Sequence, residues 1–460
     1  MSLQFITGNS GNGKTKYLFN RIVKEAKANP RDNYLVIVPE QFTMQTQRQL
    51  VDLSENKAIM NIDVLSFKRL AYRVFDELGI TNLTVLEETG KNLVLRKLAA
   101  QEADKLGVIG RNLNRIGYIS EVKSLLSELV QYNISPEELG RYIVSGRLSD
   151  TLSDKLKDVL VLYEAFEKFM KDKYITAEEI LNVLCNVAEE SAILRNSVIA
   201  FDEFTGFTPI QNQLIKKLFV ISKKIYVTLT IDCREDIFKS RGMQELFDMP
   251  KRTVKSLTEM AAFYGIEVEE PIILDKNYRL AENEELSFME QQLFRKRRCS
   301  FKKVPKHIHI DCLRDPKQEL TKIARRINEL VRNENLRYRD IAIVTGDVNI
   351  YAGYVREIFD KYNIPYFIDA TQEILFHPFI EFIRSIPDIA AQNFSADAVF
   401  RFLRCGFSEL LDSEIDVLEN YVLACGVRGK SAWDKKWVRL PKHKAGYDIE
   451  LLNQSREYIM

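Results

Sequence analysis

Hydrophobic residues in the first part of the chain come in short continuous runs, separated by polar and glycine-rich segments. Leu3–Thr7, Tyr34–Val38 and Ile62–Leu65 are such runs, and between the first two the apolar residues recur at helical spacing from Lys16 until Pro30. Strands that are buried on both faces of a parallel sheet have this composition. The pattern therefore predicts alternating strands and helices in an α/β fold.

The pattern changes between residues 84 and 189, where long stretches have helical spacing and few turn residues. The predicted helices of this region are Leu93–Leu106, Gly117–Tyr132 and Asp154–Met170. Strand-like runs return at Ser197–Phe201 and Lys224–Ile231. We therefore predict one α/β domain built from residues 1–83 and 190–275, with 84–189 as an all-helical insertion.

A second α/β pattern follows a basic, linker-like stretch that begins at Arg295. Its predicted strands are His307–Leu313, Ile341–Thr345 and Tyr366–Asp369, and its predicted helices are Lys317–Val331 and Tyr351–Tyr362. We predict that this domain spans residues 276–400. Residues 401–460 are predicted to start a further helical insertion that is truncated at Met460.

Composition narrows the class of protein. The 460 residues include 66 basic and 65 acidic side chains, for a net charge of +1. This balance excludes a strongly basic nucleic-acid binder as a property of the whole chain, although a local basic groove remains compatible with it. The six cysteines form no C-x-x-C pair, which favours free thiols in a reducing compartment. Without a signal peptide or an apolar run of about 18 residues, the expected location is the cytoplasm, with no membrane partner.

One segment carries specific chemistry. Residues 8–15 read Gly8-Asn9-Ser10-Gly11-Asn12-Gly13-Lys14-Thr15 and fit the P-loop pattern G-x-x-x-x-G-K-[ST] between a strand and a helix. Glycines allow backbone N–H groups to surround phosphate oxygens, and the helix N-terminus adds a positive dipole. The expected ligands are ATP and Mg²⁺, with Lys14 on the β- and γ-phosphates and Thr15 on the metal.

A P-loop needs a second oxygen ligand near the metal. The apolar run Val198–Phe201 ends in Asp202 and Glu203. We expect Asp202 to hold the Mg²⁺ shell and Glu203 to polarise an attacking water as the catalytic residue. Nearly 190 residues separate this pair from the P-loop, which is typical of large motors with inserted domains and not of small nucleotide kinases.

The segment Asn277-Tyr278-Arg279 resembles motif IV of superfamily 1 helicases. The resemblance implies that Arg279 approaches the γ-phosphate from across an interdomain cleft, and thus belongs to the nucleotide site. Residues 337–344 and 364–366 resemble the second motor domain of these helicases. The implied fold is a P-loop NTPase with tandem RecA-like helicase domains and helical insertions.

More narrowly, nearly the whole chain resembles the N-terminal part of the B subunits of AddAB-type (RexAB-type) ATP-dependent helicase–nucleases of bacteria. The segments that carry this resemblance are 5–8, 38–43, 66–71 and 204–209. It implies a role in resecting DNA double-strand breaks for homologous recombination and in reading a Chi-type sequence. It also implies the A subunit as a heterodimer partner, DNA single strands and duplex ends as substrates, and a nuclease domain with an iron–sulfur cluster in the family's C-terminal part.

The loops that follow the second and third strands should lie at the same sheet edge as the P-loop. In superfamily 1 helicases this edge faces single-stranded nucleic acid. The resulting DNA-binding candidates are Gln41, Thr43, Gln45, Ser66, Phe67 and Lys68. Phe67 would stack on a base, and the alternative for all six is an ordinary strand-to-helix loop.

Some helicase features are absent from the sequence. Seven residues precede Gly8, so the adenine-reading Gln upstream of the P-loop is missing, and Asp232-Cys233-Arg234 lacks the Gln of the motif G-D-x-x-Q. Nucleotide binding is expected, whereas translocation by this chain alone is not. Two alternatives stay open: a non-catalytic scaffold with a vestigial P-loop, and a P-loop phosphotransferase.

Overall fold

The computed structural model describes residues 1–81, 84–110, 116–145, 148–171, 173–295, 299–369, 374–441 and 447–460. The chain divides into two compact units, Met1–His309 and Ile310–Met460. Among the described residues, no helix is long and apolar enough to cross a membrane.

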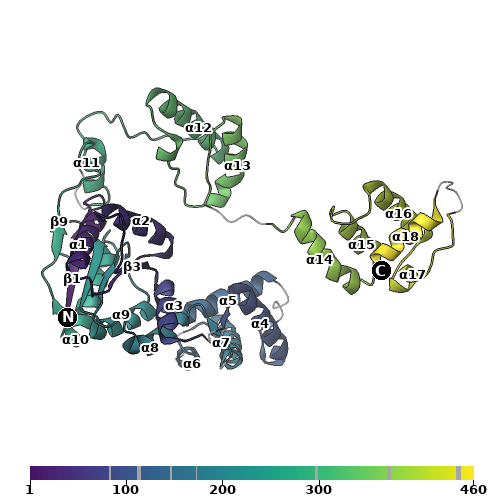
Figure 1. Ribbon diagram of the computed structural model, residues 1–460, viewed down its shortest axis with the longest axis horizontal. Helices are drawn as coiled ribbons and strands as arrows, with labels where there is room; N and C mark the ends of the chain where they lie inside the picture. Colours follow the sequence, from purple (N-terminus) through teal and green to yellow (C-terminus); the bar gives the residue numbers. More distant parts are fainter. Residues whose placement is uncertain are drawn as a thin grey trace. The chain divides into compact units, whose positions relative to one another are not determined.

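The first unit is built on a parallel sheet (Figure 1). Its strands are β1 (Ser2–Gly8), β2 (Tyr34–Ile37), β3 (Ile62–Leu65), β6 (Val198–Phe201), β7 (Lys224–Thr230), β8 (Glu267–Val268) and β9 (Ile272–Leu274). The order is β3-β2-β6-β7-β1-β8, with β9 also paired to β1, and every pairing is parallel. The α/β class and the five strands predicted for this region are confirmed.

Helices cover both faces of the sheet because the strands alternate their apolar side chains between two cores. On one face Ile6 and Val36 pack against α1 (Lys14–Ala28) and α2 (Thr43–Leu53). On the other face Phe5 and Ile37 pack against a second set of helices. That set consists of α3 (Phe67–Leu78), α8 (Ile180–Val187), α9 (Pro209–Ile221) and α10 (Asp248–Phe263).

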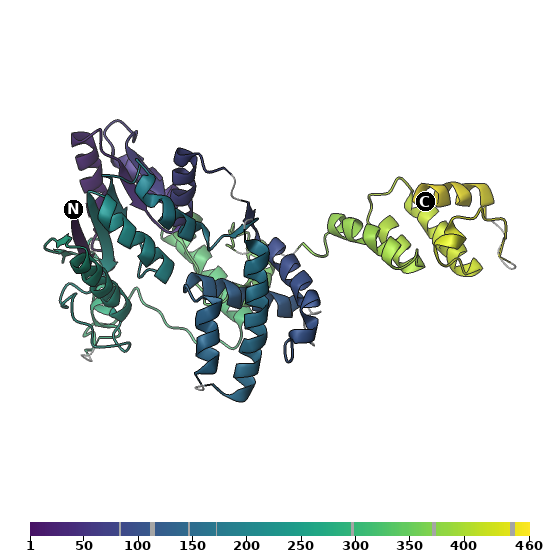
Figure 2. The same cartoon turned by 90° about the horizontal axis from the view of Figure 1, so that it is seen from below.

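The helical insertion has a core of its own (Figure 2). Its helices are α4 (Glu88–Gln101), α5 (Ile116–Gln131), α6 (Pro136–Val144) and α7 (Asp150–Met170). A small parallel pair, β4 (Val85–Leu86) and β5 (Ile175–Thr176), joins the two ends of the insertion. Helix α8 belongs to the sheet core, so the helical core ends before the predicted boundary at 189.

Lys91 connects two segments of the insertion through ion pairs. Its side chain is 2% exposed, and its Nζ contacts Glu178 at 2.7 Å and Glu88 at 2.9 Å. Burial alone would lower the pKa of Lys91, but the hydrogen bonds to Glu178 and Glu88 outweigh it and raise the pKa. The ion pair thereby links α4 to the segment that follows β5.

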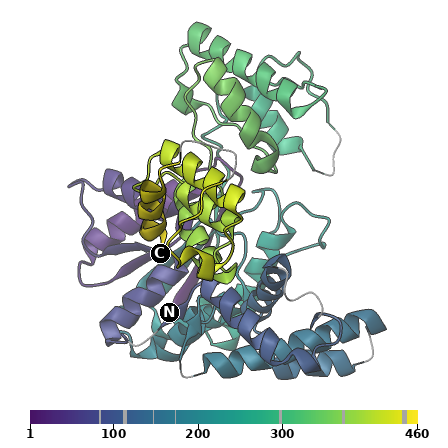
Figure 3. The same ribbon diagram turned by 90° about the vertical axis from the view of Figure 1, so that its right-hand side faces the viewer.

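In the described part of the second unit, the helices pack around two separate hydrophobic cores. Helices α12 (Pro316–Asn333) and α13 (Val348–Lys361) pack against each other (Figure 3). The other core is formed by α14 (Pro378–Ala391), α15 (Ala396–Leu403), α16 (Asp412–Cys425), α17 (Lys430–Trp433) and α18 (Ile449–Ile459). Trp433 and Trp437 are buried there, with ring centroids 5.3 Å apart.

The strands predicted for the second α/β domain are wrong. Residues 307–313, 341–345 and 366–369 are described and contain no strand. Val344 is 92% and Phe367 88% exposed, so neither side chain packs as a buried strand residue would. Of the elements predicted for this domain, the helices form and the strands do not. The domain limits 276–400 and 401–460 stay predictions.

Candidate nucleotide site

The P-loop connects β1 to α1 at the carboxyl edge of the sheet. Gly11 and Gly13 have φ angles of +88° and +78°, in the left-handed region that favours glycine. Helix α1 then begins at Lys14, so its first N–H groups face the loop. A glycine-containing loop at a helix N-terminus is an arrangement that favours an anion.

Lys14 is anchored to the loop that precedes it. Its Nζ donates to the carbonyl oxygens of Gly8 and Asn9, both at 3.0 Å. An ammonium group has three N–H donors, so one remains for a phosphate oxygen. Burial lowers the pKa of Lys14, although the carboxylates of Asp202 and Glu203 act to raise it.

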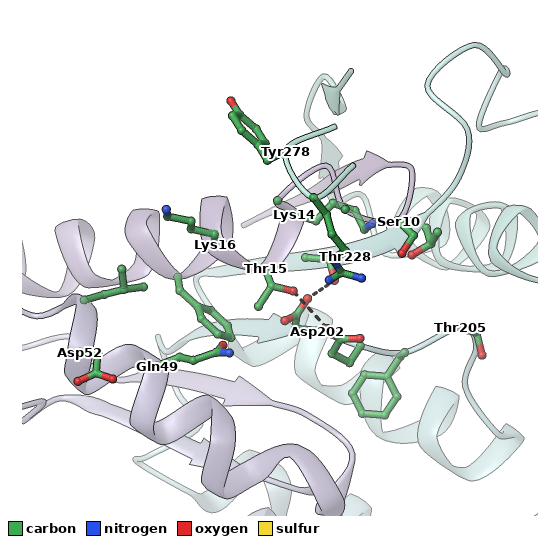
Figure 4. A pocket seen from close by; sticks show the side chains of 18 residues that line it. Ser10, Lys14, Thr15, Lys16, Gln49, Asp52, Asp202, Thr205, Thr228 and Tyr278 are labelled. Carbon is green, nitrogen blue, oxygen red and sulfur yellow. Dashed lines mark hydrogen bonds between the residues drawn. The ribbon is translucent and has the colours of Figure 1, made fainter. Parts of the chain in front are cut away.

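Asp202 and Glu203 follow β6, and β7 lies between β6 and the strand that leads into the P-loop. Figure 4 shows Asp202 beside Thr15 and Thr228. Asp202 is buried, and its Oδ1 accepts a hydrogen bond from the Thr228 hydroxyl. Its Oδ2 is buried without a hydrogen-bond partner among the described residues. Burial raises the pKa of Asp202, against the hydrogen bond from Thr228. Glu203 is exposed with φ +64°, and its Oε1 accepts from the Thr15 hydroxyl at 3.3 Å.

These oxygens suit a magnesium ion. Mg²⁺ is usually held by one or two protein oxygens together with substrate phosphates and water. The unpartnered Oδ2 of Asp202 and the Thr15 hydroxyl are oxygen ligands of this kind. Among the described residues, no group of three or more His, Cys, Asp or Glu side chains is arranged for a metal ion.

The segment after β9 is bonded to the P-loop. Asn277 Nδ2 donates to the Ser10 carbonyl at 2.9 Å, and the Tyr278 N–H donates to the Gly11 carbonyl at 3.0 Å. Asn12 Nδ2 donates to the Leu274 carbonyl at 2.5 Å in the opposite direction. Tyr278 and Arg279 are thereby placed beside the loop.

Part of the P-loop, the acidic pair after β6 and the Tyr278-Arg279 pair line one cavity of about 700 Å³. Its lining residues are Ser10, Gly11, Gly13, Lys14, Thr15, Lys16, Phe19, Gln49, Asp52, Leu53, Asp202, Glu203, Phe204, Thr205, Thr228, Thr230, Tyr278 and Arg279. Arg279 lies in the same compact unit as the P-loop. The resemblance implies an approach from across an interdomain cleft, whereas here the β1–β9 pairing brings the arginine to the loop.

Asn9 extends the site toward α11 (Glu284–Gln292). Its Nδ2 donates to Glu290 at 2.9 Å, and its Oδ1 accepts from the Cys233 N–H at 2.9 Å. The neighbouring Asp232 is buried between Arg234 and Arg295, with its Oδ2 at 2.6 and 3.0 Å. Burial would raise the pKa of Asp232, but the hydrogen bonds from Arg234 and Arg295 hold it well below its ordinary range.

Sequence reasoning missed this network. The basic stretch at Arg295 is typical of a solvated linker, yet the Arg295 side chain is only 12% exposed. Lys296, Arg297 and Arg298 of the same stretch lie outside the described residues. The signal that could have found Arg295 is the buried acid Asp232 at the end of a predicted strand, since such a charge needs a partner.

The six DNA-binding candidates divide into two groups. Gln41, Gln45 and Lys68 are exposed after β2 and β3, and because the strands are parallel they share the sheet edge with the P-loop. Thr43 and Ser66 are buried and serve their own helices: Thr43 Oγ1 donates to Glu40, and Ser66 caps α3.

Phe67 is in the hydrophobic core, so the prediction that its ring stacks on a base is wrong. The ring is 7% exposed and lies 5.5 to 6.3 Å, between centroids, from those of Phe201, Phe204 and Phe207. A residue at the first position of a helix that follows a strand can point inward as easily as outward, and here the aromatic cluster favours the inward direction.

Comparison with known proteins places the chain in a family. A family model described as ADDB, N-terminal, matches residues 5–290. A protein of Lachnoclostridium phytofermentans is 38% identical over 467 residues, covering 100% of this chain and 40% of that protein. Proteins of Clostridium acetobutylicum and Clostridioides difficile are 34% and 33% identical, covering 95% and 100% of this chain. All three are named as the B subunit of an ATP-dependent helicase/deoxyribonuclease. The chain spans about two fifths of the length of these relatives.

Proposed function

The chain belongs to the ADDB N-terminal family, and from this premise we propose that it is the nucleotide- and DNA-binding, helicase-like region of one subunit of an ATP-dependent helicase–nuclease. The whole protein would process DNA double-strand breaks for homologous recombination, with an A subunit as its partner. The names of the relatives support this assignment, because they describe an ATP-dependent enzyme made of more than one subunit.

The observation that carries the nucleotide part is the single cavity that joins the P-loop to Asp202, Glu203 and Arg279. In the proposed complex the free N–H of Lys14 binds a β- or γ-phosphate oxygen. Thr15 and Asp202 hold Mg²⁺, which neutralises phosphate charge when it is bound. Glu203 orients a water, and Arg279 balances charge on the γ-phosphate.

Lys14→Ala tests nucleotide binding. Removing the loop ammonium should weaken Mg-ATP binding by at least tenfold, about 1.4 kcal/mol, in calorimetry. Lys24→Ala is the matched control, because Lys24 is an exposed residue of the same helix and does not line the cavity. Equal ATP affinity for wild type and Lys14→Ala would refute the proposed site.

We propose that the DNA surface is the sheet edge with Gln41, Gln45 and Lys68, which would contact a single strand and contribute to reading a Chi-type sequence. Thr43, Ser66 and Phe67 would support this surface from below, since their side chains are buried. With a net charge of +1, affinity must come from a local surface, and its salt dependence should be shallow. Lys68→Ala should reduce the slope of log affinity against log salt concentration by about one, the contribution of one phosphate contact.

Turnover by this chain alone is expected to be slight. Asp232-Cys233-Arg234 lacks the Gln of G-D-x-x-Q, and the loss of one group that stabilises charge on the γ-phosphate, such as an arginine finger, can cost roughly 10³–10⁵ in rate. The purified chain should bind ATP without DNA-stimulated hydrolysis or unwinding of a tailed duplex. Robust unwinding would show that the chain is a motor in its own right.

A further inference from the structure

Helix α2 contributes three residues to the nucleotide cavity, although no sequence pattern assigned it to the nucleotide. Gln49, Asp52 and Leu53 line the cavity from the C-terminal half of the helix. Their spacing of three and four residues places them on one helix face. The opposite end of α2 follows the exposed Gln41.

The sheet order places this helix at the end of the cavity where Asp202 lies. Strand β2, which leads into α2, lies beside β6, whose end carries Asp202. Helix α2 also packs against α1, and Leu50 shares a core with Leu18. Figure 4 shows Gln49 extending toward the Thr15–Asp202 end of the cavity, with Asp52 further along α2.

The chemistry of the three side chains differs. Leu53 has no polar group, and the Asp52 carboxylate repels phosphate. The Gln49 amide carries two N–H donors. Gln49 is exposed, and no hydrogen bond of its side chain is found among the described residues.

Under the proposed function, the γ-phosphate lies between Lys14 and the metal ligands Thr15 and Asp202. This is the end of the cavity that Gln49 approaches. We propose that Gln49 donates a hydrogen bond to the γ-phosphate of bound ATP. The inference rests on the proposed nucleotide site and adds to it a residue that distinguishes ATP from ADP.

Gln49 would thereby supply an amide, whereas the segment that lacks the Gln of G-D-x-x-Q supplies none. The segment after β7 has Cys233 and Arg234 after Asp232, and the Asp232 carboxylate is held by Arg234 and Arg295. A neutral amide from the neighbouring helix can bind the γ-phosphate without adding charge to a cavity that already contains three carboxylates, Asp52, Asp202 and Glu203.

The test compares two ligands on the full chain with Mg²⁺ present. Calorimetry would measure the affinity for ADP and for a non-hydrolysable ATP analogue. Gln49→Ala should lower affinity for the ATP analogue by about tenfold, the cost of one hydrogen bond to a charged group. Its affinity for ADP should stay within about twofold of wild type, because ADP has no γ-phosphate.

Gln47→Ala is the matched control, since Gln47 is an exposed glutamine on the same helix that does not line the cavity. It should leave both affinities unchanged. A loss in Gln49→Ala that is equal for the two ligands, or no loss at all, would overturn the role of Gln49 while leaving the nucleotide site intact. Failure of the wild type to bind either ligand would overturn the nucleotide site as well, and with it this inference.

Discussion

The backbone N–H of Tyr278 donates a hydrogen bond to the carbonyl oxygen of Gly11 at 3.0 Å. The segment after β9 therefore holds the P-loop, which follows β1. Asn277 reinforces this contact through Ser10. The P-loop is thus fixed both by α1 and by the segment after β9. Its shape depends on residues that are distant in the sequence.

Gly11→Ala should disrupt this contact. A Cβ at Gly11 would lie 2.7 Å from Asn277 Oδ1 and 2.9 Å from Arg279 Cβ. We expect at least a tenfold loss of ATP affinity, because the loop or the 277–279 segment must shift. Gly79→Ala is the control: Gly79 also has a positive φ, but a Cβ there has no neighbour within 4 Å. Thermal unfolding with and without ATP would separate the two, and similar ATP-dependent shifts in both variants would contradict the expectation.

Asp202→Asn should stabilise the nucleotide-free protein while abolishing Mg-dependent ATP binding. The carboxylate is buried, and burial disfavours its charged form, so a neutral amide of nearly the same shape should cost less to bury. Mg-dependent ATP binding should be lost because the variant no longer has the carboxylate proposed to bind the metal. Chemical denaturation and calorimetry on the same variant would check both, and a variant less stable than wild type would refute the reasoning.

The same carboxylate predicts a pH dependence. Burial raises the pKa of Asp202 above its ordinary value of 3.8, so the folded state binds its proton more tightly than the unfolded state. Its contribution to stability therefore becomes less favourable as pH rises from about 4 through the raised pKa. Asp202→Asn should remove this part of the pH profile, which denaturation at a series of pH values would show.

Phe67→Ala should cost folding stability without a direct effect on DNA affinity. Removing a buried phenylalanine typically costs about 3–5 kcal/mol, and Phe67 is packed among three other rings. Lys68→Ala, one residue on and exposed, should show the reverse: unchanged stability and weaker DNA binding. A stable Phe67→Ala variant that loses DNA affinity per folded molecule would restore the stacking role.

Lys91→Met should strongly destabilise the helical insertion. It leaves Glu178, which is 12% exposed, as a buried charge without its closest partner, and breaking a buried pair in this way costs about 3–5 kcal/mol. The double variant Lys91→Met/Glu178→Leu should recover much of the loss. A double variant as unstable as the single one would show that the ion pair is not the cause.

The Lys91–Glu178 pair also predicts a loss of stability in strong acid. Burial would raise the pKa of Glu178, but the hydrogen bond from Lys91 outweighs it and lowers the pKa below its ordinary value of 4.5. The stability that this pair contributes is therefore complete above pH 4.5 and is lost as pH falls through the lowered pKa. Wild type should lose more stability than the double variant over this acidic range, as measured by denaturation.

The first sheet could be predicted because its strands are short apolar runs next to unambiguous helix signals. Strands β8 and β9 were missed, since they are two and three residues long and partly exposed. Helix α6 was missed for a different reason: Ser135-Pro136 is also typical of a turn. In the structure Ser135 caps the helix in a capping box with Glu138, and Pro136 is its first residue.

The site was predictable where one segment held the chemistry, as with Lys14 and Asp202. It was not predictable where the contact depends on packing. The inward rotation of Phe67 and the position of Gln49 follow from how helices lie on the sheet, which spacing alone does not fix. The strands predicted in the second unit show the same limit, because an apolar run becomes a strand only when a neighbouring strand pairs with it.

The parallel pairing described for the first sheet also has a consequence for synthesis on the ribosome. The P-loop is translated well before the strands that complete its sheet: β2 lacks its partner β6 until Val198 has emerged, and β1 lacks β9 until Leu274 has emerged. At about 5–20 residues per second, the loop waits tens of seconds for the strands that hold it. During that interval the helical insertion, whose core lies within one continuous stretch of chain, is free to fold first. Nascent chains would then acquire a structured insertion well before they acquire the ability to bind a nucleotide.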